Sequence, residues 1–187
     1  MDQIVNKPQI DSFVPKEPIK KKPLVSVIVP VYNIKPKWLD LCINSVLNQI
    51  FENWELSVYN DGSTIKSTID ALRKWEGKDK RIKIRSGKSQ KGISIALNEA
   101  VKMSSGEYFM WAADDDTRGK SYIFNCVLTL NKNKNAALCS PDTKVFISQD
   151  DDVLYTSSIE FFSEKIKLIN RYKEVLNNFP MTAFYGL

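Results

Sequence analysis

Residues 24–31 of this chain carry the sequence Leu-Val-Ser-Val-Ile-Val-Pro-Val. Branched apolar side chains dominate the run, as they do in parallel strands that are covered on both faces. Pro30 has no backbone N–H for a strand ladder, so we expect the strand to end there. The run therefore predicts a buried strand at the centre of the fold.

Strand and helix patterns alternate after this run. Apolar residues recur at helical spacing in some segments, and short apolar or aromatic runs separate these segments. The predicted helices cover 37–49, the residues after 64 up to about 75, and 93–103, and the predicted strands cover 54–59, 81–85 and 107–112. This alternation predicts an α/β fold, a Rossmann-like, mostly parallel sheet with helices on both faces.

The two ends of the chain are less regular. Residues 1–22 carry three prolines among polar and lysine residues, which predicts a flexible lead-in before a domain over 23–187. After residue 116 the pattern predicts a helix over 122–130, strands over 144–148 and 154–157, and a last helix over 159–177.

Composition and charge narrow the class of protein. The 187 residues are 43% hydrophobic, enough for one well-cored domain, and no apolar run approaches the length of a membrane helix. The start of the chain lacks the features of a secretory signal, so we expect a cytoplasmic protein. The net charge of +5 is consistent with weak attraction to a nucleoside diphosphate, or to an acidic membrane surface in peripheral association. Nucleic-acid motifs are absent, and we expect no nucleic-acid partner.

The residue types also limit the chemistry. The chain has no histidine, which excludes catalytic triads and dyads that use a histidine base and leaves carboxylates as acid–base groups. Its three cysteines, Cys42, Cys126 and Cys139, are far apart within apolar patterns. They suggest buried thiols rather than a disulfide framework or a zinc site.

Acidic residues follow the predicted strand over 107–112. Asp114, Asp115 and Asp116 place three carboxylates at a strand end, where oxygen ligands can hold Mg²⁺ or Mn²⁺ and the metal can hold a diphosphate. The alternative is a solvated acidic loop that caps the next helix.

Two further polar clusters follow the first and second predicted strands. Asp61 could accept a hydrogen bond from a nucleobase, although an Asp-Gly-Ser sequence also forms simple Asx turns. Tyr32 could stack on a base and Asn33 could fix the turn, although a tyrosine at a strand end is often only packed there. Because ligands bind beyond the carboxyl ends of parallel strands, we expect all three clusters to converge on one crevice.

These motifs together resemble family 2 glycosyltransferases, which have the GT-A fold. Residues 25–33 are similar to the family's opening strand, and residues 60–64 resemble its Asp-Asp-Gly-Ser-Thr turn. Gly92, residues 96–98 and residues 106–108 repeat the order and spacing seen in the family before an aspartate cluster. The resemblance is good over about 23–116 and weaker beyond.

The resemblance implies transfer of a sugar from a nucleoside diphosphate sugar, often a uridine one, to an acceptor hydroxyl with inversion. The acceptor would be a glycan, a lipid or a protein, and Mn²⁺ or Mg²⁺ would be the cofactor. The implied donor-binding residues are Pro30, Val31, Tyr32, Asn33, Asp61, Lys91 and Asp114, and the implied metal ligands are Asp115 and Asp116.

The sequence departs from the family pattern in two places. Asn60 and Ala113 stand where the family usually has aspartates. The family's catalytic base lies in an acceptor-binding part that we expect beyond Leu187, so the base is unknown and we expect the chain to be part of a longer protein. Two other functions are also compatible with the sequence, a non-catalytic nucleotide-binding or interaction domain and a nucleotidyltransferase.

Overall fold

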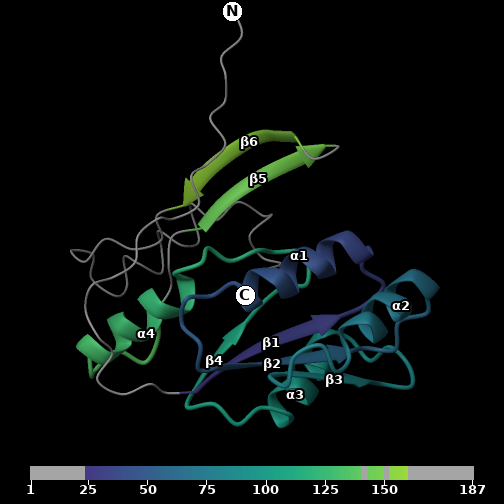
Figure 1. Cartoon of the computed structure of the whole chain (residues 1–187), viewed down its shortest axis with the longest axis horizontal. Helices are drawn as coiled ribbons and strands as arrows, with labels where there is room; N and C mark the ends of the chain where they lie inside the picture. The colour runs from purple at the N-terminus through teal and green to yellow at the C-terminus, as the bar shows by residue number, and fades with distance from the viewer. Residues whose placement is uncertain (1–23, 140–142, 150–151, 160–187) are drawn as a thin grey trace, which may run out of the picture. The chain divides into compact units, whose positions relative to one another are not determined.

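The computed structural model describes residues 24–139, 143–149 and 152–159 (Figure 1). The predicted lead-in over 1–22 lies outside these residues. So does the predicted last helix, apart from Ile159, which ends a strand. The chain divides into a unit that ends at Cys139 and a unit that begins at Ser140, and each is described by itself.

A four-stranded parallel sheet forms the first unit. Its strands are β1 (Val25–Val31), β2 (Trp54–Asn60), β3 (Ile82–Ser86) and β4 (Tyr108–Trp111). They lie in the order β3-β2-β1-β4, so the chain moves outward from β1 through β2 to β3 and then returns to the other side of β1. The predicted parallel sheet is confirmed, and its strand order reverses between β1 and β4.

Pro30 lies inside β1 rather than at its end. Even-numbered residues of β1 direct their backbone groups towards β4, since Ile28 O accepts the N–H of Ala112, and odd-numbered ones face β2, since Val31 O accepts the N–H of Asp61. The N–H that Pro30 lacks would therefore face β4, whose pairing with β1 ends opposite Ile28. The proline ends the hydrogen-bond ladder with β4, while pairing with β2 continues past Pro30 to Val31.

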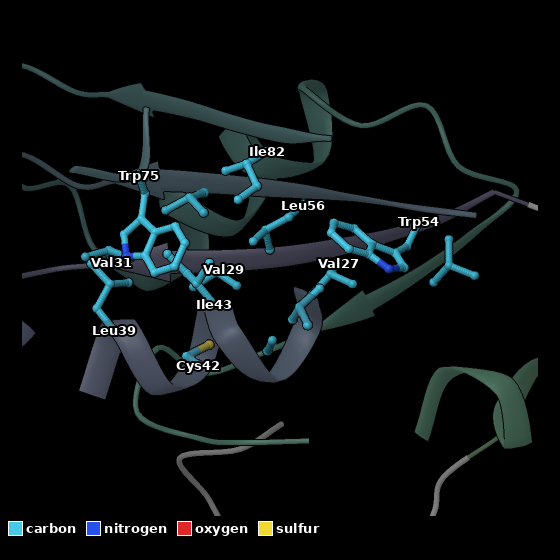
Figure 2. Packing of buried hydrophobic residues seen from close by; sticks show 14 of the residues in the cluster. Val27, Val29, Val31, Leu39, Cys42, Ile43, Trp54, Leu56, Trp75 and Ile82 are labelled. Atoms are coloured by element: carbon cyan, nitrogen blue, oxygen red, sulfur yellow. The ribbon is translucent and has the colours of Figure 1, made fainter. Parts of the chain in front are cut away.

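Helices cover both faces of the sheet. They are α1 (Pro36–Leu47), α2 (Lys66–Trp75), α3 (Ile93–Lys102) and α4 (Tyr122–Lys132). The larger core joins α1, α2 and α4 to the alternate residues Val25, Val27, Val29 and Val31 of β1, and Figure 2 shows part of this packing. On the other face, α3 packs against Ile28 and Tyr59 through Ala96 and Ala100. Period-two alternation along β1 and β2 thus supplies both cores.

The second unit contains an antiparallel pair, β5 (Thr143–Gln149) and β6 (Asp152–Ile159). The two strands predicted over 144–148 and 154–157 are confirmed, and a register irregularity falls between Ile147 and Ser148. Among the residues described in both units, none of the helices has the length and apolar content needed to cross a membrane.

A buried carboxylate joins the amino-terminal ends of the strands. Glu55 on β2 accepts hydrogen bonds from the Ser26 hydroxyl on β1 (2.6 Å), from Lys83 Nζ on β3 (2.7 Å) and from the backbone N–H of Ser105 before β4. Burial raises the pKa of Glu55, but these hydrogen bonds outweigh burial and hold the pKa at about 2. One side chain therefore connects β1, β2, β3 and the segment that leads into β4, at the edge opposite to the polar turns.

We expect Glu55→Gln to destabilise the chain in a pH-dependent way. A lowered pKa in the folded state contributes stability above the unfolded-state pKa, and this contribution is lost as the pH falls towards the folded-state pKa. The variant should lose about 2 kcal/mol of unfolding free energy at pH 7, and its difference from the parent should shrink between about pH 5 and pH 3. Urea unfolding at each pH measures both effects.

Glu99→Gln is the matched control, since Glu99 is paired with Lys102 on the surface of α3. It should change stability much less than Glu55→Gln at pH 7, and its effect should depend less on pH. A loss in Glu55→Gln that stays constant down to pH 3 would contradict the assignment.

Candidate functional site

The turns that follow β1, β2 and β4 meet at the carboxyl edge of the sheet. The N–H of Asp61, after β2, donates to Val31 O of β1 (2.8 Å). The backbone of Tyr32, after β1, lies close enough to the carboxyl group of Asp114, after β4, to lower its pKa. The predicted convergence of the three polar clusters is therefore confirmed, and it falls where the strand order reverses.

Asn33 connects the turn after β1 to the start of α2. Its Oδ1 accepts the N–H groups of Thr64 (2.9 Å) and Ile65 (3.0 Å), and its own N–H donates to Ser63 Oγ (2.9 Å). Its backbone has a φ of 52°, in the left-handed region that asparagine tolerates better than most residues. Asn33 thus fixes the turn, as the sequence predicted. Its role in donor binding stays a prediction.

Asp61 connects the turn after β2 to the loop before α3. Its Oδ2 accepts the N–H of Gly92 (2.8 Å), and both carboxylate oxygens are within hydrogen-bonding distance of the N–H of Lys91 (3.0 and 3.1 Å). The residue is only 4% exposed. The carboxylate is therefore held in one orientation, while Oδ1 retains a lone pair for a further donor.

Gly62 allows this loop to approach. Its φ is +67°, and a Cβ built on it would lie 2.5 Å from the carbonyl carbon of Ser89 and 2.8 Å from the nitrogen of Gln90. Both atoms belong to the backbone and cannot move aside cheaply. A side chain at position 62 would therefore push the loop from Ser86 to Gly92 off the turn.

Asn60 replaces the usual aspartate without leaving the turn unbonded. Its Oδ1 accepts the N–H of Ser63 (2.9 Å), as an aspartate would, and its Nδ2 donates to Ser86 Oγ (3.2 Å). The Asx turn and a bond to the end of β3 are both made by one neutral side chain. This departure from the family pattern is structurally compatible with the site.

The acidic cluster forms a tight turn. The N–H of Asp116 donates to Ala113 O (3.3 Å), so Asp114 and Asp115 take the two central positions. Burial, with a smaller contribution from the charge of Asp115, raises the pKa of Asp114 to about 6. Burial also raises the pKa of Asp116, and the Arg118 guanidinium, 4.0 Å from its carboxylate, partly offsets this.

A divalent cation fits this turn only if the turn supplies part of its ligands and a bound substrate supplies the rest. Within the described ranges, no group of three or more acidic, cysteine or histidine side chains is arranged to hold a metal ion. Asp114 and Asp115 nevertheless repel each other electrostatically, and a cation between them would relieve that repulsion. Mg²⁺ is commonly held by one or two carboxylates together with substrate phosphates, so the donor set fits such a site. The positive charge of the Arg118 guanidinium already lies beside the Asp116 carboxylate. The assignment of Asp116 as a metal ligand stays a prediction.

The remaining predicted residues lie at the same edge. The Tyr32 side chain is 39% exposed and therefore accessible for stacking, and Lys91 is exposed on the loop that Asp61 holds. Val31 is 1% exposed, and its side chain belongs to the larger core. Its backbone alone reaches the edge, next to the half-buried Pro30. Direct donor contacts by these residues stay predictions.

Two residues that touch the acidic turn were not predicted. Cys42 of α1 donates its thiol to Ala113 O (3.3 Å), and Arg118 donates to the same carbonyl (3.5 Å). In the sequence, Cys42 has the pattern of an ordinary core residue, and a single arginine after three aspartates is typical of a charged surface. Only the fold shows that both bind the turn.

The chain is similar in sequence to proteins of a known family. The model of the family described as glycosyl transferase family 2 matches residues 26–185, and the chain belongs to this family. An uncharacterized glycosyltransferase of Haemophilus influenzae is 36% identical over 132 residues, which cover 71% of this chain and 40% of the relative.

Two solved glycosyltransferase structures share the fold. One is TarS (residues 1–349) of S. aureus in complex with UDP-GlcNAc, with a TM-score of 0.53 and 26% identity over 59% of this chain and 32% of that one. The other is the mannosyltransferase PcManGT of Pyrobaculum calidifontis in complex with GDP-Man and Mn²⁺, with a TM-score of 0.54 and 26% identity over 59% of this chain and 33% of that one. The predicted GT-A fold is confirmed. This chain spans less than half the length of each of these relatives.

Replacing Asp61 should release the loop before α3. In Asp61→Asn one oxygen becomes an NH₂ donor that faces backbone N–H donors, and we expect a loss of about 2 kcal/mol of unfolding free energy, as for a buried hydrogen-bonding group left without its partner. Amide hydrogen exchange at Lys91 and Gly92 should accelerate. Asp70→Asn, which removes a surface ion pair with Lys66 on α2, is the control and should leave both amides protected. Unchanged exchange at Lys91 and Gly92 in Asp61→Asn would refute the assignment.

Replacing Asp114 should stabilise the metal-free chain. Because the pKa of Asp114 is raised in the folded state, the folded chain loses stability as the pH rises through about 6. In EDTA at pH 7.5, Asp114→Asn should exceed the parent by about 1 kcal/mol, a figure reduced for partial solvent exposure, and the gain should vanish below about pH 4. Thermal unfolding across this pH range measures the effect. A less stable variant at pH 7.5 would show that the carboxylate is not under electrostatic strain.

Proposed function

We propose that this chain carries the donor-binding part of an enzyme that transfers a sugar from a nucleoside diphosphate sugar to an acceptor hydroxyl with inversion. The observation that supports the proposal best is the meeting of three polar turns where strand order reverses, in a chain of glycosyl transferase family 2. The donors held by the two structural relatives, UDP-GlcNAc and GDP-Man, support this donor class. We favour a uridine donor because TarS is in complex with UDP-GlcNAc, and Asp61 would accept the N–H of the uracil ring.

The donor would lie against the fixed side of the site. Asp61 offers the base a carboxylate oxygen whose orientation is already set by the N–H groups of Lys91 and Gly92. Such a group loses little freedom when a ligand binds. Tyr32 would stack on the base, and the exposed Lys91 would approach the diphosphate. The sugar would then face the acidic turn.

The acidic turn would hold the divalent cation. Asp114 and Asp115 carry the carboxylates that repel each other, and the donor's phosphates would complete the ligand set. When bound, Mn²⁺ or Mg²⁺ would neutralise charge on the nucleoside diphosphate as it leaves. The presence of Mn²⁺ in the complex of PcManGT supports this part of the proposal.

Inversion requires a general base on the acceptor side. A carboxylate would take the proton of the acceptor hydroxyl as its oxygen attacks the anomeric carbon, a contribution of about 10²–10⁴ in rate. We propose that this group belongs to the acceptor-binding part of the enzyme. The acceptor, whether glycan, lipid or protein, would be selected by that part as well.

Titration with nucleotides tests the donor proposal. We expect the chain to bind one of UDP, GDP, CDP and dTDP in the presence of Mn²⁺ and to lose most of that affinity in EDTA, as measured by calorimetry. Asp115→Asn should weaken the Mn²⁺-supported affinity by about 10-fold or more while the variant stays folded, because a carboxylate–metal contact is removed.

Asp70→Asn provides the matched control for this titration. It removes an aspartate from a surface pair on α2, and it should bind as the parent does. Failure of the parent to bind any of the four nucleotides would overturn the proposal in favour of an interaction domain. Binding that ignores both EDTA and Asp115→Asn would overturn the metal assignment alone.

A further inference from the structure

Arg118 turns back onto the acidic turn that precedes it. Its Nη1 donates to Asp116 O (3.0 Å) and to Ala113 O (3.5 Å), and its Nη2 lies 4.0 Å from the Asp116 carboxylate. The side chain is only 8% exposed. A single guanidinium therefore bonds the first and the last residue of the turn whose central residues are Asp114 and Asp115.

The same carbonyl is bound from the helix side. Cys42 of α1 donates its thiol to Ala113 O (3.3 Å), and Arg118 Nη1 lies 3.8 Å from the sulfur. Burial raises the pKa of the Cys42 thiol to about 11, so the group is a protonated donor at neutral pH. The turn is thus fastened to α1, a helix of the larger core.

A guanidinium suits this place for geometric and electrostatic reasons. Its planar set of N–H donors can bond two carbonyl oxygens and a carboxylate at once, which an ammonium group cannot do with the same fixed geometry. It also places one positive charge beside a run of three carboxylates. The turn can therefore keep Asp114 and Asp115 close together before any cation arrives.

We propose that Arg118 is a positioning residue that fixes the acidic turn for the metal and the donor diphosphate. The inference rests on the proposed function, because positioning matters only if Asp114 and Asp115 receive a cation and phosphates. Arg118 contacts neither group in this proposal. It acts by holding both ends of the turn, as groups outside the ligand set commonly do in metal sites.

Three variants of the full chain test the proposal. Arg118→Met removes the charge and all donors, Arg118→Lys keeps the charge without the planar donor set, and Arg81→Met is the control. Arg81 also bonds a carbonyl and a carboxylate, those of Glu52 and Asp79, but it lies just before β3, at the amino-terminal edge of the sheet. Each protein is titrated with Mn²⁺ alone, with UDP and GDP in Mn²⁺, and with the same nucleotides in EDTA.

We expect Arg118→Met to bind Mn²⁺ and the Mn²⁺-supported nucleotide about 10-fold to 100-fold more weakly, with nucleotide affinity in EDTA unchanged. Arg118→Lys should fall between the parent and Arg118→Met, and Arg81→Met should match the parent. Metal-supported affinity equal to that of the parent in both Arg118 variants would overturn the inference. So would an equal fall with and without metal that follows a loss of thermal stability, since that result would mark a purely structural role.

Hydrogen exchange separates this inference from the proposed function. The Asp116 amide donates to Ala113 O and should exchange faster in both Arg118 variants than in the parent and in Arg81→Met. If the parent binds no nucleotide, the proposed function fails, and exchange together with Mn²⁺ affinity still decides whether Arg118 orders the turn. Unchanged exchange at Asp116 would overturn the positioning role whatever the nucleotide result.

Discussion

Helix starts in this fold depend on side chains that come from elsewhere in the chain. None of the four helices of the first unit has a capping hydrogen bond from the side chain of its own N-cap residue. Instead Asn33 accepts the N–H groups of the two residues before α2, and Asp61 those of the two residues before α3. Gln49 accepts the N–H of Ile123 in the first turn of α4. Each bond satisfies a backbone donor and also fixes one connecting segment against another. At the carboxyl edge of the sheet, the turns are therefore held together by the bonds of Asn33 and Asp61, whose partners lie 30 to 32 residues away.

This arrangement makes the site rigid and limits which residues its turns can contain. A nucleotide that binds to Asp61 meets a carboxylate already fixed by backbone donors, and little conformational freedom remains to be lost. The same bonds make Gly62 obligatory, because the loop backbone passes where a Cβ would stand. The acidic turn differs, since burial, and to a smaller extent the charge of Asp115, raises the pKa of Asp114, so ionisation of this carboxyl group costs folding stability. Under the proposed function, the base would meet a rigid half of the site, and the cation would meet a half whose carboxyl groups are costly to ionise.

The sequence was sufficient to predict the elements and the meeting point of the turns, because both depend on local patterns and on a general property of parallel sheets. The run of branched apolar side chains along β1 identified the buried strand, and the carboxyl ends of neighbouring parallel strands necessarily share one edge. The end of β1 was misplaced at Pro30, since which neighbour loses a hydrogen bond depends on the side that the missing N–H faces. The bonds of Asn33 and Asp61 were also beyond sequence reasoning. Their partners lie about 30 residues away, and no local pattern identifies them.

The two departures from the family pattern have different physical consequences. Asn60 keeps the acceptor that an aspartate would offer and adds a donor for Ser86, so the turn after β2 retains its bonds with one charge fewer. Ala113 offers no side-chain acceptor at all. Its carbonyl instead accepts hydrogen bonds from Cys42, Arg118 and Asp116. This position therefore stabilises the turn through its backbone and offers no side-chain ligand. A guanidinium among the aspartates then acts on the geometry of the turn, and the carboxylates of Asp114 and Asp115 remain available for a cation.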